Sequence, residues 1–137
     1  MKEKNVKQYI IIRTDLEMSI GKTAAQAAHA AQKVFFDKFK DTLIEGDDDE
    51  IKKGFCFITT EEEIQYIKGR FTKIVKKVKN ENQLISTYQK ALEAGLNCSL
   101  IKDVGLTELV GENYTAVCIG PNYEEDCMPI VKRLRNL

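Results

Sequence analysis

RTDLEMSIGKTAAQAAHA, residues 13–30, marks the passage from a strand into a helix. After a charged turn, a glycine and a lysine open an alanine-rich segment that predicts a helix over residues 21–39. Lys22, Gln26 and His29 stand at offsets of four and seven, so they share one face of that helix. Most of the remaining positions are alanine, which packs closely against other backbone. A polar stripe that holds the only histidine, on a helix that otherwise looks buried, indicates a site.

The length and composition predict one domain, residues 1–137, with a real core. Charged residues make up 31% and apolar residues 43% of the 137-residue chain, which is ordinary for a globular protein. Arg13 and Asp15 end the apolar stretch near the N-terminus, so we expect neither a signal peptide nor a membrane span. The four cysteines show no CxxC spacing, which favours free thiols, a reducing cytoplasmic setting and no metal cofactor.

Charge is unevenly distributed along the chain. Residues 41–65 hold nine acids and two lysines, a balance of −7, so the remainder carries +7. A basic body is compatible with a polyanionic partner such as RNA, and equally with lysines and arginines that only solvate the surface. If RNA is the partner, Lys2, Lys4, Lys33 and Lys102 are candidate contacts.

Strand-like and helix-like segments alternate, which predicts an α/β fold with one mixed sheet covered by helices on both faces. Thr60 with Glu63 forms a capping-box pattern, and Ser19, Asn80 and Asp126 are candidate helix caps. The acidic segment is interpreted as an insertion at one end of the sheet. The expected strands are 7–13, 54–59, 71–79, 97–102 and 115–119, the expected helices are 21–39, 60–69, 81–94 and 127–135, and 41–53 is expected to be a weak helix or a loop.

Three side chains invite both a chemical and a plain structural interpretation. Asp103 follows a strand directly, where a carboxylate can orient a catalytic group or simply tie a turn. His29 is either a packed core residue or a general base, since histidine titrates near neutral pH. Lys22 lies near a helix N-terminus, which disfavours cations unless an anion is close. The GKT at 21–23 is not a phosphate-binding loop, because Leu16 stands where that motif needs glycine.

The signature around the first helix resembles that of the type 2 peptidyl-tRNA hydrolases of archaea and eukaryotes. The resemblance covers residues 7–40 and 70–137 and leaves 41–69 as a divergent insertion. The matching residues are Arg13-Thr14-Asp15-Leu16, Met18, Gly21-Lys22, Ala24-Ala25-Gln26, His29-Ala30, Ala94-Gly95-Leu96, Ser99-Leu100-Ile101, Asp103, Gly105, Thr107, Thr115 and Ile119-Gly120-Pro121.

The resemblance implies a single α/β domain with a four-stranded mixed sheet, acting in the cytoplasm as a homodimer without a cofactor or an obligatory metal. It further implies hydrolysis of the ester between a peptide and the 3′ end of tRNA. The site it implies comprises Lys22, His29, Asp103 and Thr107 as catalytic residues, with Gln26 and Thr115 in substrate binding. No serine or cysteine in this set is an obvious nucleophile, so direct attack by water is the simpler scheme, with either Asp103 or His29 as base.

Two other functions remain open at this point. The chain departs from the family pattern at Leu106 and at residues 111–113, which leaves room for a divergent member that acts on another acyl-tRNA or binds tRNA without cleaving it. The acidic insertion leaves room for a non-catalytic protein-interaction module. The joint presence of Lys22, His29, Asp103 and Thr107 speaks against a purely structural role, because a scaffold has no need for that set.

Overall fold

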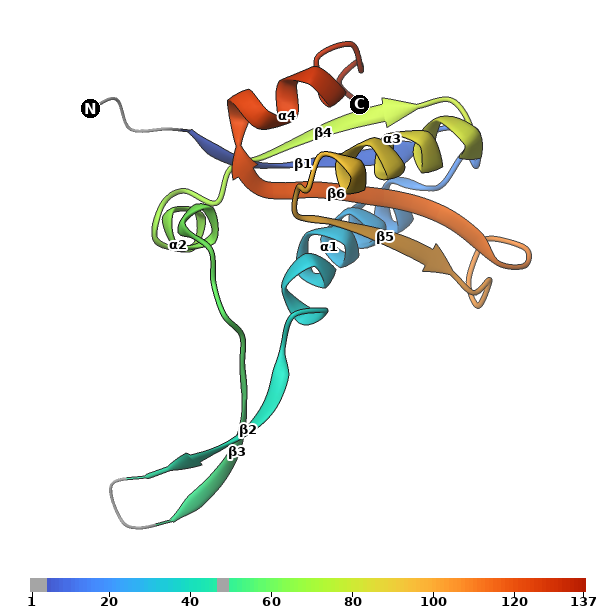
Figure 1. Cartoon of the computed structure of the whole chain (residues 1–137). Helices are drawn as coiled ribbons and strands as arrows, with labels where there is room; N and C mark the ends of the chain where they lie inside the picture. Colours follow the sequence, from blue (N-terminus) through green and yellow to red (C-terminus); the bar gives the residue numbers. More distant parts are fainter. Residues whose placement is uncertain (1–4, 47–49) are drawn as a thin grey trace.

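The structure is a computed structural model that describes residues 5–46 and 50–137 (Figure 1). Lys2, Lys4 and the Asp47-Asp48-Asp49 part of the acidic run lie outside the described residues. The elements, in chain order, are β1 (Val6–Arg13), α1 (Ile20–Phe36), β2 (Lys40–Glu45), β3 (Ile51–Cys56), α2 (Glu61–Lys68), β4 (Lys73–Val78), α3 (Glu81–Glu93), β5 (Cys98–Asp103), β6 (Asn113–Tyr123) and α4 (Glu124–Val131).

The main sheet has four strands in the order β4-β1-β6-β5, which confirms the predicted mixed sheet. β1 pairs with β4 in parallel and with β6 antiparallel, and β5 is antiparallel to β6. The strands β1, β4 and β5 therefore run in the same direction, and their carboxyl ends lie on the same side of the sheet. Loops that leave the carboxyl ends of strands are where α/β folds place their ligands.

Alternating residues of β1 divide the core between two layers of helices. Tyr9 and Ile11 point to the side that α3 and α4 cover, while Ile10 and Ile12 point to the side of Ala30 and Ala31 in α1. This is the period of two that a strand buried on both faces requires. This packing fixes α1 on one face of the sheet, where the helix lies over β5 and β6.

Within 41–53, residues 41–45 and 51–53 belong to strands, whereas the prediction was a weak helix or a loop. β2 and β3 pair antiparallel, with Thr42 opposite Gly54, and form a separate two-stranded sheet that projects from the body (Figure 1). The predicted strand 54–59 is thus displaced to Ile51–Cys56. Aromatic rings join the base of this hairpin to the end of α1, with Phe39 and Phe57 centroids 5.2 Å apart. The prediction failed because strand pairing is a non-local choice, which Gly46 and the acidic run obscure in the sequence.

The caps confirm several predicted boundaries and correct one. Ser19, Thr60 and Asn80 each accept a hydrogen bond from the backbone N–H three residues on, which starts α1, α2 and α3 as expected. Asp126 does not cap the last helix: α4 begins at Glu124 after Tyr123, and Asp126 lies in its first turn beside two other acids. Negative charge is favourable there because it faces the positive end of the helix dipole.

β6 is longer than predicted because it runs through Gly120 and Pro121 to Tyr123. The sequence pair Gly-Pro favours a strand end. In the structure, the pairing register with β1 shifts between Lys7 and Tyr9, and this irregularity accommodates the proline in a central strand. Gly120 is required there, because a Cβ atom would collide with the carbonyl oxygen of Lys7.

Candidate functional site

Lys22 and Asp103 meet at the edge where β1, β4 and β5 end. Lys22 lies in the first turn of α1, and Asp103 is the last residue of β5. The Lys22 Nζ atom donates to Asp103 Oδ1 at 2.6 Å and to Thr107 Oγ1 at 2.7 Å. An ammonium group has three N–H donors, so these two contacts leave one donor for a ligand. Both charged side chains are nearly buried, with exposed fractions of 11% and 10%.

Asp103 is held as a carboxylate. Its second oxygen, Oδ2, accepts a hydrogen bond from the backbone N–H of Gly105 at 2.9 Å. The hydrogen bond from Lys22 lowers the pKa of Asp103, and the Gly105 N–H and, less strongly, His29 act in the same direction, while desolvation opposes them. A carboxylate with a lowered pKa is a weak proton acceptor, because base strength follows the pKa. Asp103 is thus better suited to hold Lys22 charged than to act as a base.

His29 lies two turns of α1 beyond Lys22 and is exposed to solvent. It is not the packed core residue that one interpretation of the sequence allowed. His29 shares one face of α1 with Lys22 at an offset of seven residues, and its exposed imidazole is accessible to a substrate or a water molecule.

Gln26 and Thr115 form a buried pair beneath the helix. The Thr115 hydroxyl on β6 donates to the Gln26 Oε1 atom on α1, and the two residues are 0% and 3% exposed. The pair ties the polar stripe of α1 to the sheet. The structure thus brings Lys22, Asp103 and Thr107 into one hydrogen-bonded group, and places Gln26 with Thr115 in a second, interior contact.

Glu108 is a residue of this region that the sequence interpretation missed. Its carboxylate accepts hydrogen bonds from the Ser19 backbone N–H at 2.8 Å and from the Ser19 hydroxyl at 2.6 Å. The same contacts lower the pKa of Glu108. The loop 104–112 is thereby clasped to the N-terminus of α1. A carboxylate that follows Thr107 by one position gave no local signal, because its partner stands 89 residues earlier.

The conformation of the loop 104–112 depends on glycine. Gly105 has a positive φ of 81°, and a Cβ atom at this position would lie 2.6 Å from the Gly111 carbonyl oxygen. The two ends of the loop therefore touch through their backbones. This close approach keeps Thr107 over Asp103, at the distance from which it accepts a hydrogen bond from Lys22.

A further group of polar contacts lies at the end of β1, next to the site. Arg13 donates to both carboxylate oxygens of Asp15, at 3.0 and 2.8 Å, and to the Tyr114 carbonyl oxygen at 3.0 Å. This bidentate pair fixes the turn between β1 and α1 against the start of β6.

Residues 5–46 and 50–137 contain no group of three or more His, Cys, Asp or Glu side chains that could hold a metal ion. Within the same residues, every helix is too short or too polar to cross a bilayer.

Comparison with known proteins gives the same result over nearly the whole chain. The family model described as "Peptidyl-tRNA hydrolase PTH2" matches residues 6–137. The chain belongs to this family. Proteins named peptidyl-tRNA hydrolase are similar to it: one from Methanocaldococcus jannaschii is 35% identical over 96% of this chain and 100% of its own length. One from Methanococcus maripaludis strain C6 is 35% identical over 95% and 97%, and one from Sulfolobus acidocaldarius is 36% identical over 88% and 90%.

The match to the peptidyl-tRNA hydrolase PTH2 family spans residues 6–137, a range that contains the hairpin as well as the four-stranded sheet. The resemblance stated from the sequence signature is therefore confirmed. The alternatives of a non-catalytic module or of a member without hydrolase activity are not favoured by these relatives.

Proposed function

We propose that this chain hydrolyses the ester bond between a peptide, or an N-blocked amino acid, and the 3′ end of tRNA, by direct attack of water. The single observation that carries the mechanism is the group formed by Lys22, Asp103 and Thr107 at the carboxyl edge of the sheet. Membership of the peptidyl-tRNA hydrolase PTH2 family supports the substrate.

Lys22 acts as the oxyanion stabiliser in this proposal. Water adds to the ester carbonyl carbon, and the carbonyl oxygen takes up negative charge. The third N–H of the Lys22 ammonium is the donor that meets this charge, while Asp103 and Thr107 hold the other two. A preformed, nearly buried ammonium needs little reorganisation when the charge develops.

His29 is the proposed base. It accepts a proton from the attacking water and returns it to the ribose oxygen as the carbon–oxygen bond of the ester breaks. The products are a peptide with a free carboxylate and tRNA with a free terminal hydroxyl. His29 is favoured over Asp103, because both Asp103 oxygens already accept hydrogen bonds and its pKa is lowered.

Gln26 and Thr115 have a positioning role in this scheme. Their side chains bind each other in the interior, so they orient α1 on the sheet rather than contact the ester. The sequence interpretation assigned them to substrate binding. The proposal therefore retains them in the site and changes what they do.

The chain is further proposed to act as a homodimer in the cytoplasm. An apolar groove beside α1 supports the dimer, because it is lined by Ile20 and Leu137, which are 92% and 55% exposed. The free thiols fit a reducing compartment. Analytical ultracentrifugation of the wild-type chain and of Ile20→Asp tests the dimer: the variant should sediment as a monomer, and a wild-type monomer would contradict the proposal.

The activity is tested by incubating purified protein with N-acetyl-aminoacyl-tRNA and measuring the release of deacylated tRNA. Release without added metal is expected, and Asp103→Ala serves as the inactive control. Tight binding of the substrate without release would favour a tRNA-binding protein instead. Complete inhibition by a chelator, reversed by zinc, would show that the proposed mechanism is wrong.

A further inference from the structure

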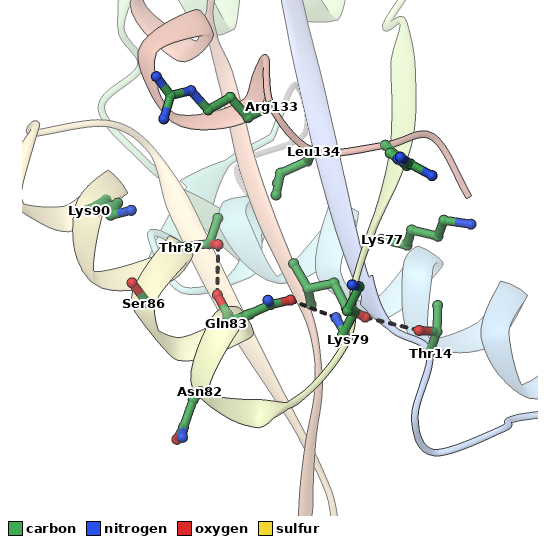
Figure 2. Close-up of a pocket in the computed structure, with 12 residues that line it drawn as sticks. Thr14, Lys77, Lys79, Asn82, Gln83, Ser86, Thr87, Lys90, Arg133 and Leu134 are labelled. Carbon is green, nitrogen blue, oxygen red and sulfur yellow. Dashed lines mark hydrogen bonds between the residues drawn. The ribbon is translucent and has the colours of Figure 1, made fainter.

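A basic groove lies on the opposite face of the sheet from Lys22 and Asp103. It has a volume of about 760 Å³ and runs between the end of β4, α3 and the segment after α4 (Figure 2). Five of the residues that line it are cationic and none is acidic. The lining cations are Lys77, Lys79, Lys90, Arg133 and Arg135, and the remaining lining residues are Thr14, Val78, Asn82, Gln83, Ser86, Thr87 and Leu134.

The cations of the groove have no ion-pair partners among the described residues. Lys33 and Lys102, which the sequence suggested as RNA contacts, are each paired: Lys33 with Asp37 at 2.7 Å and Lys102 with Glu112 at 2.8 Å. By contrast, the side chains of Lys79, Lys90 and Arg133 form neither a salt bridge nor a side-chain hydrogen bond within residues 5–46 and 50–137. Their charges are available to a partner.

The fold brings these cations together from distant parts of the sequence. The last residues of the chain run along the free edge of β4, where Lys77 N–H donates to the Arg135 carbonyl oxygen at 2.9 Å. Figure 2 shows Arg133 on the segment that follows α4 and Lys90 on α3, and both line the groove. Lys79 follows β4, where its backbone N–H donates to Gln83 Oε1 at 2.8 Å, so the start of α3 is fixed against it.

The chemistry of the groove fits a chain of phosphates better than a single anion. Like charges that gather without acids raise the local positive potential, and a polyanion relieves their repulsion. The charges are spread over three segments of the chain rather than converging on one point. Ser86 adds an exposed hydroxyl, a group that often contacts the sugar-phosphate backbone.

The groove and the Lys22–Asp103 site both lie at the end of the sheet where β1, β4 and β5 finish. Lys79 follows the carboxyl end of β4, and Asp103 is the carboxyl end of β5. In the strand order β4-β1-β6-β5 these ends are three strand intervals apart, about 14 Å at the usual spacing. An RNA strand of a few nucleotides can cross this edge from one face to the other.

We propose that the groove between β4, α3 and the C-terminal segment binds backbone phosphates of the tRNA, upstream of the 3′ terminus that occupies the Lys22–Asp103 site. This inference rests on the proposed function, because it takes tRNA as the substrate. Lys90 from α3 and Arg133 from the C-terminal segment contact phosphates, while the chemistry remains with Lys22 and His29.

The test compares the double variant Lys90→Gln/Arg133→Gln with the matched control Lys68→Gln/Arg70→Gln, which removes two exposed cations near the end of α2. Binding of uncharged tRNA is measured by fluorescence anisotropy from 50 to 400 mM salt. Loss of two phosphate contacts lowers the slope of log Kd against log salt by about 1.4–1.8 and weakens binding roughly tenfold at low salt. The control should leave both quantities unchanged.

Steady-state kinetics separates this inference from the proposed function. With N-acetyl-aminoacyl-tRNA, the groove variant should show a raised KM and an unchanged kcat, because the groove binds ground state and transition state alike. A wild-type protein without hydrolysis would overturn the proposed function, while the binding assay would still decide the groove. Unchanged Kd and salt slope in the folded variant overturn the groove proposal. If the double variant changes the self-association of the protein but not its affinity for tRNA, the proposal is also overturned, because the groove then contacts a second copy of the chain.

Discussion

The Lys22 ammonium lies 2.6 Å from the Asp103 carboxylate, although 81 residues separate the two in the chain. α1 and β5 each contribute one charge, and the sheet brings the charges together at its carboxyl edge. Each residue is the counter-ion of the other. Lys22 has a counter-ion near the positive end of a helix dipole, and Asp103 has a donor where its strand ends.

Removal of either charge should abolish most hydrolysis. Lys22→Ala and Asp103→Ala should each lower kcat by about 10²–10⁴-fold, because a positioned polar group in an active site contributes on that scale. Lys33→Ala is the matched control, since Lys33 lies on the same helix and forms its ion pair with Asp37, away from Asp103. The double variant Lys22→Ala/Asp103→Ala should be little worse than either single variant, because the two act as a unit. A folded Asp103→Ala protein with the wild-type rate would remove Asp103 from the mechanism.

His29→Asn should lower kcat by about 10²–10⁴-fold, because the variant lacks the group proposed to accept the proton of the attacking water. The measurement is kcat for both proteins with N-acetyl-aminoacyl-tRNA. A folded variant with the wild-type kcat would transfer the role of base to another group. The sequence alone left Asp103 and His29 equal here, and the hydrogen bonds to Asp103 distinguish them.

The Lys22–Asp103 pair should also make stability depend on pH in the acid range. The hydrogen bond from Lys22 lowers the pKa of Asp103 below its ordinary value of 3.8. A carboxyl group with a lower pKa in the folded state stabilises the protein above the unfolded pKa, and this stabilisation is lost as pH falls through the folded pKa. Urea unfolding of wild type and Asp103→Asn should therefore differ above about pH 4 and converge as the pH falls below the folded-state pKa of Asp103. Parallel curves at every pH would show that the pair contributes nothing to folding.

Local signals in the sequence predicted the helices better than the sheet edges and the hairpin. The caps at Ser19 and Asn80 and the capping box at Thr60 depend on residues three apart, so the sequence displays them directly. The hairpin of β2 and β3 depends on cross-strand pairs, and most of its side chains remain exposed, so no buried face produces an alternating pattern.

For the candidate site too, the sequence showed the local features but not the contacts between distant segments. The spacing of Lys22 and Gln26 on one helix face is local and was visible in the sequence. That Lys22 meets Asp103 followed only from the family resemblance, and the hydrogen bond from Thr115 to Gln26 was not foreseen. The clasp of Glu108 on Ser19 was missed, because both residues look like ordinary loop and cap residues until the sheet brings their segments together.

The Glu108 clasp should affect activity more than stability. Glu108→Ala frees the loop 104–112 from the start of α1 and lets Thr107 move away from Lys22. A shift of about 1 Å in such a group can cost 10²-fold in rate. Glu108 is exposed, so the midpoint of thermal unfolding should change little. Leu106→Ala, an exposed change in the same loop, is the control. Equal rates for Glu108→Ala and wild type would show that the loop holds its position without the clasp.

The acidic run at residues 47–50 should oppose tRNA binding. Residues 41–65 carry −7 and the rest of the chain +7, so the segment both repels phosphates and competes for the basic surface. Conversion of Asp47-Asp48-Asp49-Glu50 to Asn-Asn-Asn-Gln should lower the Kd for uncharged tRNA several-fold at 50 mM salt. The gain should fade by about 0.5 M salt, because screening shortens the range of the charges to a few ångströms. Anisotropy titrations across that salt range measure both effects. A Kd that is the same in both proteins at low salt would mean that the hairpin lies away from the bound RNA, and its exposed Leu43 and Phe55 would then indicate a protein partner as its target.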